Sequence, residues 1–187
     1  MIFEPTEVDG AFVVRTEPRT DDRGHFVRLW CREEYGARGL VDHIVQINAG
    51  FSHKAGTLRG MHYQLPPHAE IKLARCTRGA VFDVIVDLRR GSPTFRRWAG
   101  VTLTPDNGAM LYVPEGCAHG YLTLEDGSEL TYATSHAYAP ASARGVRYDD
   151  PAFAIAWPRA VTVVSAADRG WPDFDDGAAV VLDGDRA

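Results

Sequence analysis

This sequence of 187 residues has few cysteines, no long apolar run and no excess of positive charge. Its three cysteines, Cys31, Cys76 and Cys117, are widely spaced without a CxxC pair, so we expect free thiols in a reducing compartment, by default the cytoplasm. No apolar run approaches the roughly 20 residues of a membrane span, and the N-terminus MIFEPTEVDG does not resemble a signal peptide. The net charge of -5 gives no global attraction to nucleic acid. We therefore expect neither nucleic acid nor a membrane as a partner.

Helix signals are also few, whereas strand signals recur along the chain. Only REEYGARG, residues 32–39, looks briefly helical. AVFDVIVDL, residues 80–88, is rich in β-branched residues and runs into the turn cluster RRGSP. Asp126-Gly127 lies between two alternating runs, which predicts a β-hairpin. Short strands separated by such turns predict one all-β domain, a barrel or jelly roll spanning residues 1–187, with a loosely held acidic tail from about residue 175.

One glycine-proline corner carries a more specific hint about the fold. The stretch VPEGCAH places Pro114, Gly116 and His119 in a P-x-G-x-x-H pattern, which resembles the second motif of the cupin superfamily. Together with the strand pattern, this resemblance implies a cupin-type double-stranded β-helix, or jelly roll, with short peripheral helices.

The segment GTLRGMHYQLPPHAEIKLAR, residues 56–75, places the cations Arg59 and Lys72 close to His62 and His68. A metal-binding cupin would need further N or O donors here, yet the second histidine is missing from His62-Tyr63-Gln64. His68 and Glu70 follow a Pro-Pro break and need not point the same way, and the ammonium of Lys72 would oppose a dication. These residues therefore favour an organic anion held beside a base, and we predict no metal and no other cofactor. A metal-dependent cupin enzyme stays an alternative.

Longer strings carry a resemblance to a known family. TLRGMHYQ, KLARCTRGAVFDVIVDLRRGSPTFRRWAGVTL, LYVPEGCAHGYLTL, LTYATSHAYAPASARGVRYDDPAFAIAWP and SAAD are similar to the dTDP-4-dehydrorhamnose 3,5-epimerase family, from about Thr20 to about Asp168. This resemblance implies an isomerase acting on a nucleotide-linked 4-keto-6-deoxyhexose. The 4-ketone acidifies the protons on C3 and C5, so inversion needs a base, a stabilised enolate and an acid on the opposite face.

The resemblance also assigns roles to individual residues. It implies His62 as the base, Asp168 as the carboxylate that orients it, and Tyr132 as the proton donor. A neutral imidazole and a phenol suit these tasks at neutral pH. The implied substrate contacts are the cation Lys72 near the sugar oxygen and six further side chains: His119, Arg59, Arg23, Gln46, Asn48 and Tyr138. Arginines suit a diphosphate, and an aromatic ring suits stacking on a base.

Three positions depart from the family pattern. Arg28 and Ala143 stand where glutamates are common, and Ala167 stands where a lysine often precedes Asp168. Because all three are expected on the nucleotide side, the sequence leaves open dTDP against CDP or GDP, and inversion of C3, C5 or both. A binding protein that kept the pocket without turnover is a further alternative. The family resemblance implies a homodimer with Arg23 reaching into the partner's site.

Overall fold

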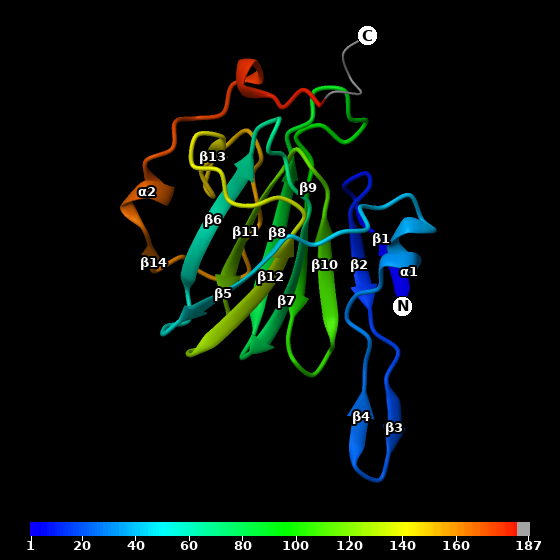
Figure 1. The fold of residues 1–187 in the computed structure, drawn as a ribbon. Coiled ribbons are helices and arrows are strands. Elements are labelled where there is room, and N and C mark those ends of the chain that lie inside the picture. The colour runs from blue at the N-terminus through cyan, green and yellow to red at the C-terminus, as the bar shows by residue number, and fades with distance from the viewer. Residues whose placement is uncertain (183–187) are drawn as a thin grey trace.

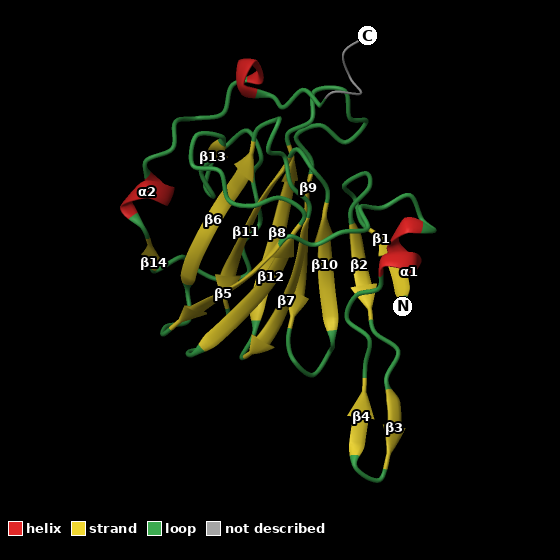
Figure 2. Cartoon of the chain, viewed as in Figure 1, coloured by secondary structure: helices red, strands yellow, loops and turns green. Residues whose placement is uncertain are grey.

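The structure, a computed structural model, describes residues 1–182 and consists mainly of strands with short helices at the periphery (Figure 1 and Figure 2). Its strands are β1 Ile2–Pro5, β2 Phe12–Arg15, β3 Arg19–Asp21, β4 Gly24–Phe26, β5 Gln46–Ser52, β6 Thr57–Gln64, β7 Lys72–Arg78, β8 Val81–Asp87, β9 Trp98–Leu103, β10 Ala109–Val113, β11 Cys117–Thr123, β12 Ser128–Thr134, β13 Ala143–Gly145 and β14 Val163–Val164. Its helical segments are α1 Arg32–Gly36, α2 Ala166–Arg169 and the single turn η1 Asp176–Ala178. The brief helix expected within residues 32–39 is therefore confirmed as α1.

Two sheets form the body of the molecule. The first has the strand order β1-β2-β10-β7-β12-β5, and the second has the order β13-β6-β11-β8-β9, with β14 added parallel to β6. From β5 to β8, and again from β9 to β12, the chain crosses repeatedly between the two sheets. This repeated crossing is the jelly roll of the cupin type, so the expected all-β fold is confirmed.

The β-hairpin predicted at Asp126-Gly127 is wrong. β11 and β12 flank this turn but lie in different sheets. The turn itself forms, with Gly127 at a φ of 68°, and it is anchored elsewhere: Asp126 accepts a hydrogen bond from the backbone N–H of Ala55 at 2.8 Å and pairs with Lys54. An Asp-Gly turn reverses the chain direction, but long-range pairing decides which strand the chain then meets.

Alternation along the strands builds the interior. In β8, Val81 and Ile85 point into the core between the sheets, whereas Val84 and Val86 pack on the outer face beneath the C-terminal segment. A third cluster, around Tyr35 of α1, covers the outer face of the first sheet. Burial on both faces explains why β8 is rich in apolar residues along its whole length and why every residue of β11 is buried.

The C-terminal segment is held more closely than the sequence predicts. Val180 is fully buried, and its backbone N–H donates to Leu88 O at 2.7 Å while its carbonyl accepts from the N–H of Arg90 at 2.9 Å. One apolar side chain in a suitable groove therefore anchors residues that composition alone marks as loose. The rest of the predicted loose tail, 183–187, lies outside the described residues.

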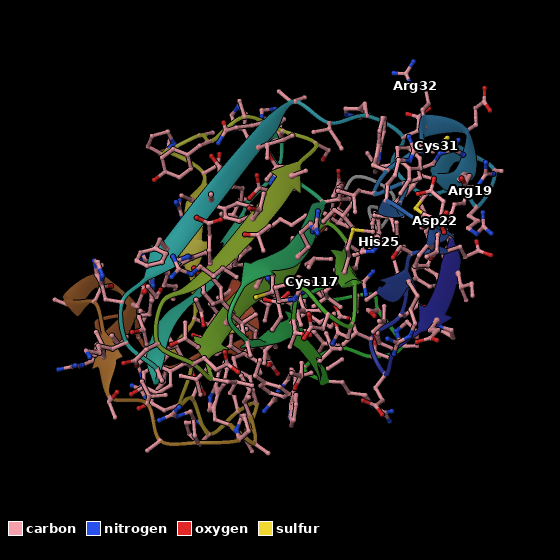
Figure 3. All side chains as sticks on the ribbon, turned by 90° about the horizontal axis from the view of Figure 1, so that it is seen from below. Arg19, Asp22, His25, Cys31, Arg32 and Cys117 are labelled. Atoms are coloured by element: carbon pink, nitrogen blue, oxygen red, sulfur yellow. The ribbon has the colours of Figure 1, made fainter. Side chains whose placement is uncertain are left out.

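The hairpin of β3 and β4 projects away from the body of the molecule (Figure 1). All of its strand residues are exposed, including Phe26 at 70%. The three cysteines are free thiols, with Cys117 among the strands and Cys31 beside α1 at the edge (Figure 3). Within residues 1–182, no helix has the length and apolar character needed to cross a membrane.

Candidate active site

A cleft of about 1040 Å³ opens between the two sheets. β5, β7 and β12 of the first sheet supply one wall, β6 and β11 of the second sheet supply the other, and the segment around α2 contributes to the rim. Nine of the ten predicted site residues line this cleft: Gln46, Asn48, Arg59, His62, Lys72, His119, Tyr132, Tyr138 and Asp168. Residues far apart in the sequence are thus brought to one place.

A bulge in β6 lets two of these residues share the cleft. Strict alternation would put Arg59 and His62 on opposite faces, because they are three positions apart. The register of β6 against β11 shifts between these two positions, so that both side chains reach the cleft. Gly60 permits the shift: it has a φ of 130°, and a Cβ there would lie 2.5 Å from the Cα of Gly120.

His62 and Asp168 form a hydrogen-bonded pair. His62 Nε2 lies 2.7 Å from Asp168 Oδ1, and Asp168 is held by α2, where its backbone N–H donates to the N-cap Ser165 at 3.0 Å. Burial raises the pKa of Asp168, but hydrogen bonds from His62 and from the backbone N–H of Gly60 outweigh burial. The pKa of Asp168 therefore lies below the usual 3.8. The ionised carboxylate accepts the proton-bearing Nε2–H, which leaves Nδ1 as the basic nitrogen of His62.

Tyr132 projects from the opposite wall. In β12 it is paired with Asn48 of β5 and Ala74 of β7. Burial, followed by the negative charge of Glu70, raises the pKa of Tyr132 above 10.0, although Arg59 opposes the rise. The phenol therefore keeps its proton at neutral pH and can donate it into the cleft.

His119 stands beside His62 on the same wall and belongs to a second histidine–carboxylate pair, which is buried. The two histidines are register partners across β11 and β6, and His119 Nε2 lies 2.8 Å from Asp83 Oδ1. Its ring is 6.4 Å from that of Tyr132 between centroids. Sequence reasoning missed Asp83. An aspartate inside the apolar run AVFDVIVDL is the signal that could have identified it, because a carboxylate that such a strand buries needs a partner.

Lys72 begins β7 and is only 7% exposed. Its Nζ donates to His62 O at 3.0 Å and lies 3.3 Å from Glu70 Oε1. Burial lowers the pKa of Lys72, and the charges of Glu70 and Asp83 oppose that effect. Glu70 lines the cleft, and sequence reasoning gave it no role in an organic site.

Neutral polar groups and an aromatic ring line another part of the cleft. Gln46 donates to Asn48 Oδ1 at 2.9 Å and accepts the backbone N–H of Tyr138 at 3.2 Å. The side chain of Tyr138 is 64% exposed, so a planar group can stack on it. The guanidinium of Arg59 donates to Ser52 Oγ at 3.2 Å and keeps other N–H groups for an anion.

The positions that depart from the family pattern divide between two places. Ala143 and Ala167 line the cleft, beside Arg144 and Trp171, which no sequence motif singled out. Arg28, expected on the nucleotide side, instead pairs with Glu34 of α1 at 2.9 Å.

Arg23 is the one predicted site residue that does not line the cleft of its own chain. It lies in the turn of the projecting hairpin, where it is 89% exposed and pairs with Asp21 at 2.6 Å.

The residues considered for a metal site have other partners. His68 Nδ1 lies 2.8 Å from Ser142 Oγ, and its ring packs edge-on against that of His136. Glu70 pairs with Lys72. Within residues 1–182, no three His, Cys, Asp or Glu side chains are grouped so as to hold a metal ion.

Comparison with known proteins gives a consistent likeness. The sequence model of the dTDP-4-dehydrorhamnose 3,5-epimerase family matches residues 5–176. A dTDP-4-dehydrorhamnose 3,5-epimerase of Sinorhizobium fredii is 41% identical over 176 residues, 93% of this chain and 90% of the relative. The structure of the Mycobacterium tuberculosis rmlC epimerase has a TM-score of 0.92 at 34% identity, covering 99% of this chain and 96% of the other. ChmJ, a 3'-monoepimerase from Streptomyces bikiniensis solved with dTDP-quinovose, has a TM-score of 0.83 at 34% identity, covering 90% and 86%.

Proposed function

The chain belongs to the dTDP-4-dehydrorhamnose 3,5-epimerase family, and from this premise we propose that its cleft inverts C3 and C5 of a dTDP-linked 4-keto-6-deoxyhexose. The protein is accordingly an epimerase, a class of isomerase. The observation that carries the proposed mechanism is that His62 and Tyr132 line one cleft from different sheets. A base and an acid on opposite walls can act on opposite faces of a sugar ring lying between them.

The proposed reaction is two proton transfers at each carbon. Nδ1 of His62 removes the proton next to the ketone, and the electron pair of the broken C–H bond moves onto the ketone oxygen. Tyr132 then delivers a proton to the other face of that carbon, and the electron pair returns to form the new C–H bond. Imidazolium and phenolate return to their starting states by exchange with water, so no electron acceptor is needed.

Two buried groups support the charged intermediate. The ammonium of Lys72 and the ring of His119 line the same cleft as the base and the acid. We assign them to the sugar oxygen on which the enolate charge develops, because cations and hydrogen-bond donors in a poorly solvated site stabilise such charge strongly.

The remaining polar residues are assigned to the nucleotide. Arg59 suits the diphosphate, and Tyr138 offers an exposed ring for the base. Gln46 and Asn48 form a linked pair of neutral groups for the nucleotide or sugar. The dTDP moiety is proposed from the relatives, since ChmJ was solved with dTDP-quinovose. Because Ala143 and Ala167 depart from the family pattern in the cleft, CDP- and GDP-linked sugars are also worth testing.

We also propose a homodimer that works in the cytoplasm. Ile47 and Phe51 are exposed at 65% and 38% on the outer side of β5, and the hairpin carries an exposed Phe26. A second copy of the chain would bury these apolar side chains and receive Arg23 near its cleft. The free thiols support a reducing compartment. Light scattering at micromolar concentration tests the dimer, and a monomeric mass contradicts it.

Deuterium incorporation tests the function. The protein is incubated in D2O with dTDP-4-keto-6-deoxyglucose, and deuterons at C3 and C5 are counted by NMR. Incorporation at both carbons with inversion is expected. Incorporation at one carbon indicates a mono-epimerase, the activity for which ChmJ is named.

Absence of incorporation would count against a dTDP-linked substrate. CDP- and GDP-linked keto sugars are then assayed in the same way. Binding of dTDP without exchange on any substrate supports a binding protein. Activity that a chelator abolishes and an added divalent metal restores supports a metal-dependent cupin enzyme.

A further inference from the structure

Glu70 is a carboxylate in the cleft that takes part in none of the proposed proton transfers. Its side chain is 10% exposed, with Oε1 at 3.3 Å from Lys72 Nζ. Its other oxygen accepts a hydrogen bond from Gln64 Nε2 at 3.2 Å. A buried negative charge is costly to desolvate, and it repels an anionic substrate. A favourable effect on a neighbouring group has to offset this cost.

That neighbour is Lys72, whose ammonium is held from two sides. One N–H donates to His62 O at 3.0 Å, and Glu70 lies on another side. Because an ammonium has three donors, one is left for the sugar oxygen. Asp83, which is bonded to His119, also acts on Lys72 through its charge. The titratable or charged side chains that line the cleft together with Lys72 are Arg59, His62, Tyr63, Glu70, His119, Tyr121, Tyr132, Tyr138, Arg144 and Asp168.

Two of these groups can keep Lys72 charged, and only one of them touches it. Glu70 contacts Nζ directly, whereas Asp83 is hydrogen-bonded to His119. Burial favours a neutral amine, which would have no positive charge to offer an enolate. The direct contact is therefore the main opposing influence.

We propose that Glu70 is a positioning residue, which keeps the ammonium of Lys72 charged and directed at the oxygen that carries the enolate charge. This inference rests on the proposed function. It adds a carboxylate whose task is electrostatic and acts through Lys72, without contact to the reacting atoms.

Gln64 connects Glu70 to the loop that carries Tyr138, so a test of Glu70 has to leave this loop in place. Its Nε2 donates to Ala137 O at 3.3 Å, and its Oε1 accepts the N–H of Ala139 at 2.6 Å, on either side of Tyr138. In the Glu70→Gln variant the amide oxygen can still accept the hydrogen bond from Gln64, so the loop of Tyr138 keeps its support. Loss of charge at position 70 should therefore change kcat and leave KM nearly unchanged.

The test is the pH profile of the Glu70→Gln variant. We expect kcat at neutral pH to fall by about 10-fold. This is less than the loss expected on removing an oxyanion-stabilising group completely, because the charge of Asp83 still favours the ammonium form of Lys72. The alkaline limb of kcat should move to lower pH, since both Lys72 and Tyr132 lose a neighbouring negative charge that raises their pKa. Glu129→Gln is the matched control: Glu129 lies in β12, bonds to Thr77 at 2.7 Å and does not line the cleft. It should leave the profile unchanged.

A double variant provides a second measurement if Glu70→Gln does not fold. Lys72→Met combined with Glu70→Gln buries no unpaired charge, and its rate should lie within about 3-fold of Lys72→Met alone. A further large loss in the double variant, or a Glu70→Gln profile identical to wild type, overturns the inference. Either result leaves the proposed function standing as long as the wild-type protein inverts its substrate. An inactive wild type instead refutes the proposed function.

Discussion

Replacing Asp168 by Asn tests the proposed base most directly. The wild-type carboxylate accepts Nε2–H of His62 at 2.7 Å, a distance typical of charge-assisted hydrogen bonds. An Asn amide can donate to Nε2 instead, which moves the proton to Nδ1 and removes the basic nitrogen from the cleft. The variant keeps an oxygen for the N–H of Gly60, and the backbone bond to Ser165 is untouched. The fold should therefore survive.

The size of the effect follows from exposure. In a fully buried triad, the same exchange lowers kcat by about 10⁴-fold. Here the side chain of His62 is 48% exposed, so water can compete for the ring and partly restore the active tautomer. We therefore expect a fall in kcat of about 10²- to 10³-fold, which is roughly 3–4 kcal/mol of lost transition-state stabilisation.

The assay compares inversion rates by NMR in the wild type and in Asp168→Asn, with thermal unfolding and dTDP binding measured in parallel. A folded variant that binds dTDP but inverts slowly supports the orienting role. A variant within about 3-fold of the wild-type rate would show that Asp168 does not set the tautomer of His62. Equal loss of binding and folding would indicate a structural residue instead.

Three further outcomes are expected. Tyr132→Phe should still incorporate deuterium, because His62 can return a deuteron to the face it came from, but inversion should fall by at least about 10²-fold; NMR of product configuration distinguishes the two. Tyr138→Ala should raise KM through a loss of about 1–3 kcal/mol in stacking and leave kcat nearly unchanged in steady-state kinetics. Asp87→Asn should lower the free energy of unfolding by about 3 kcal/mol at pH 7, because it leaves the partly buried Arg89 without its carboxylate. Burial raises the pKa of Asp87, but hydrogen bonds from Arg89, Ser92 and Thr94 outweigh burial and bring this pKa below 3.8. The stabilisation by Asp87 is therefore present above that pH and lost in stronger acid. Denaturant unfolding should show a smaller stability difference between wild type and Asp87→Asn at pH 3 than at pH 7.

Local sequence was sufficient to identify the type of fold. Turn clusters and β-branched runs such as residues 80–88 predict short strands, and strand formation depends on neighbouring residues that pack on a pleated surface. The Asp126-Gly127 turn was also predictable as a turn. The absence of a hairpin was not predictable, because β11 pairs with β6 and β8, which come earlier in the chain, and not with β12.

The family resemblance was enough to name the residues proposed for catalysis, while the partners that they contact could not be named from it. His62, Lys72 and His119 stand in recognisable strings, yet nothing near them in sequence identifies Glu70 or Asp83 as the carboxylates that Lys72 and His119 contact. The pairing of His119 with Asp83 exists only because β8 and β11 run side by side, which places their inward side chains at one depth.

The amino-acid sequence by itself determined the all-β class, the lack of excess positive charge and the set of acid–base side chains, because these depend on composition and short-range patterns. The tertiary structure decided how those side chains face one another. It placed His62 and Tyr132 on different sheets, and through the bulge at Gly60 it turned Arg59 into the cleft with His62. Alternation alone would have separated Arg59 from His62, so only the packed backbone could bring the proposed base and the proposed anion-binding guanidinium to the same cleft.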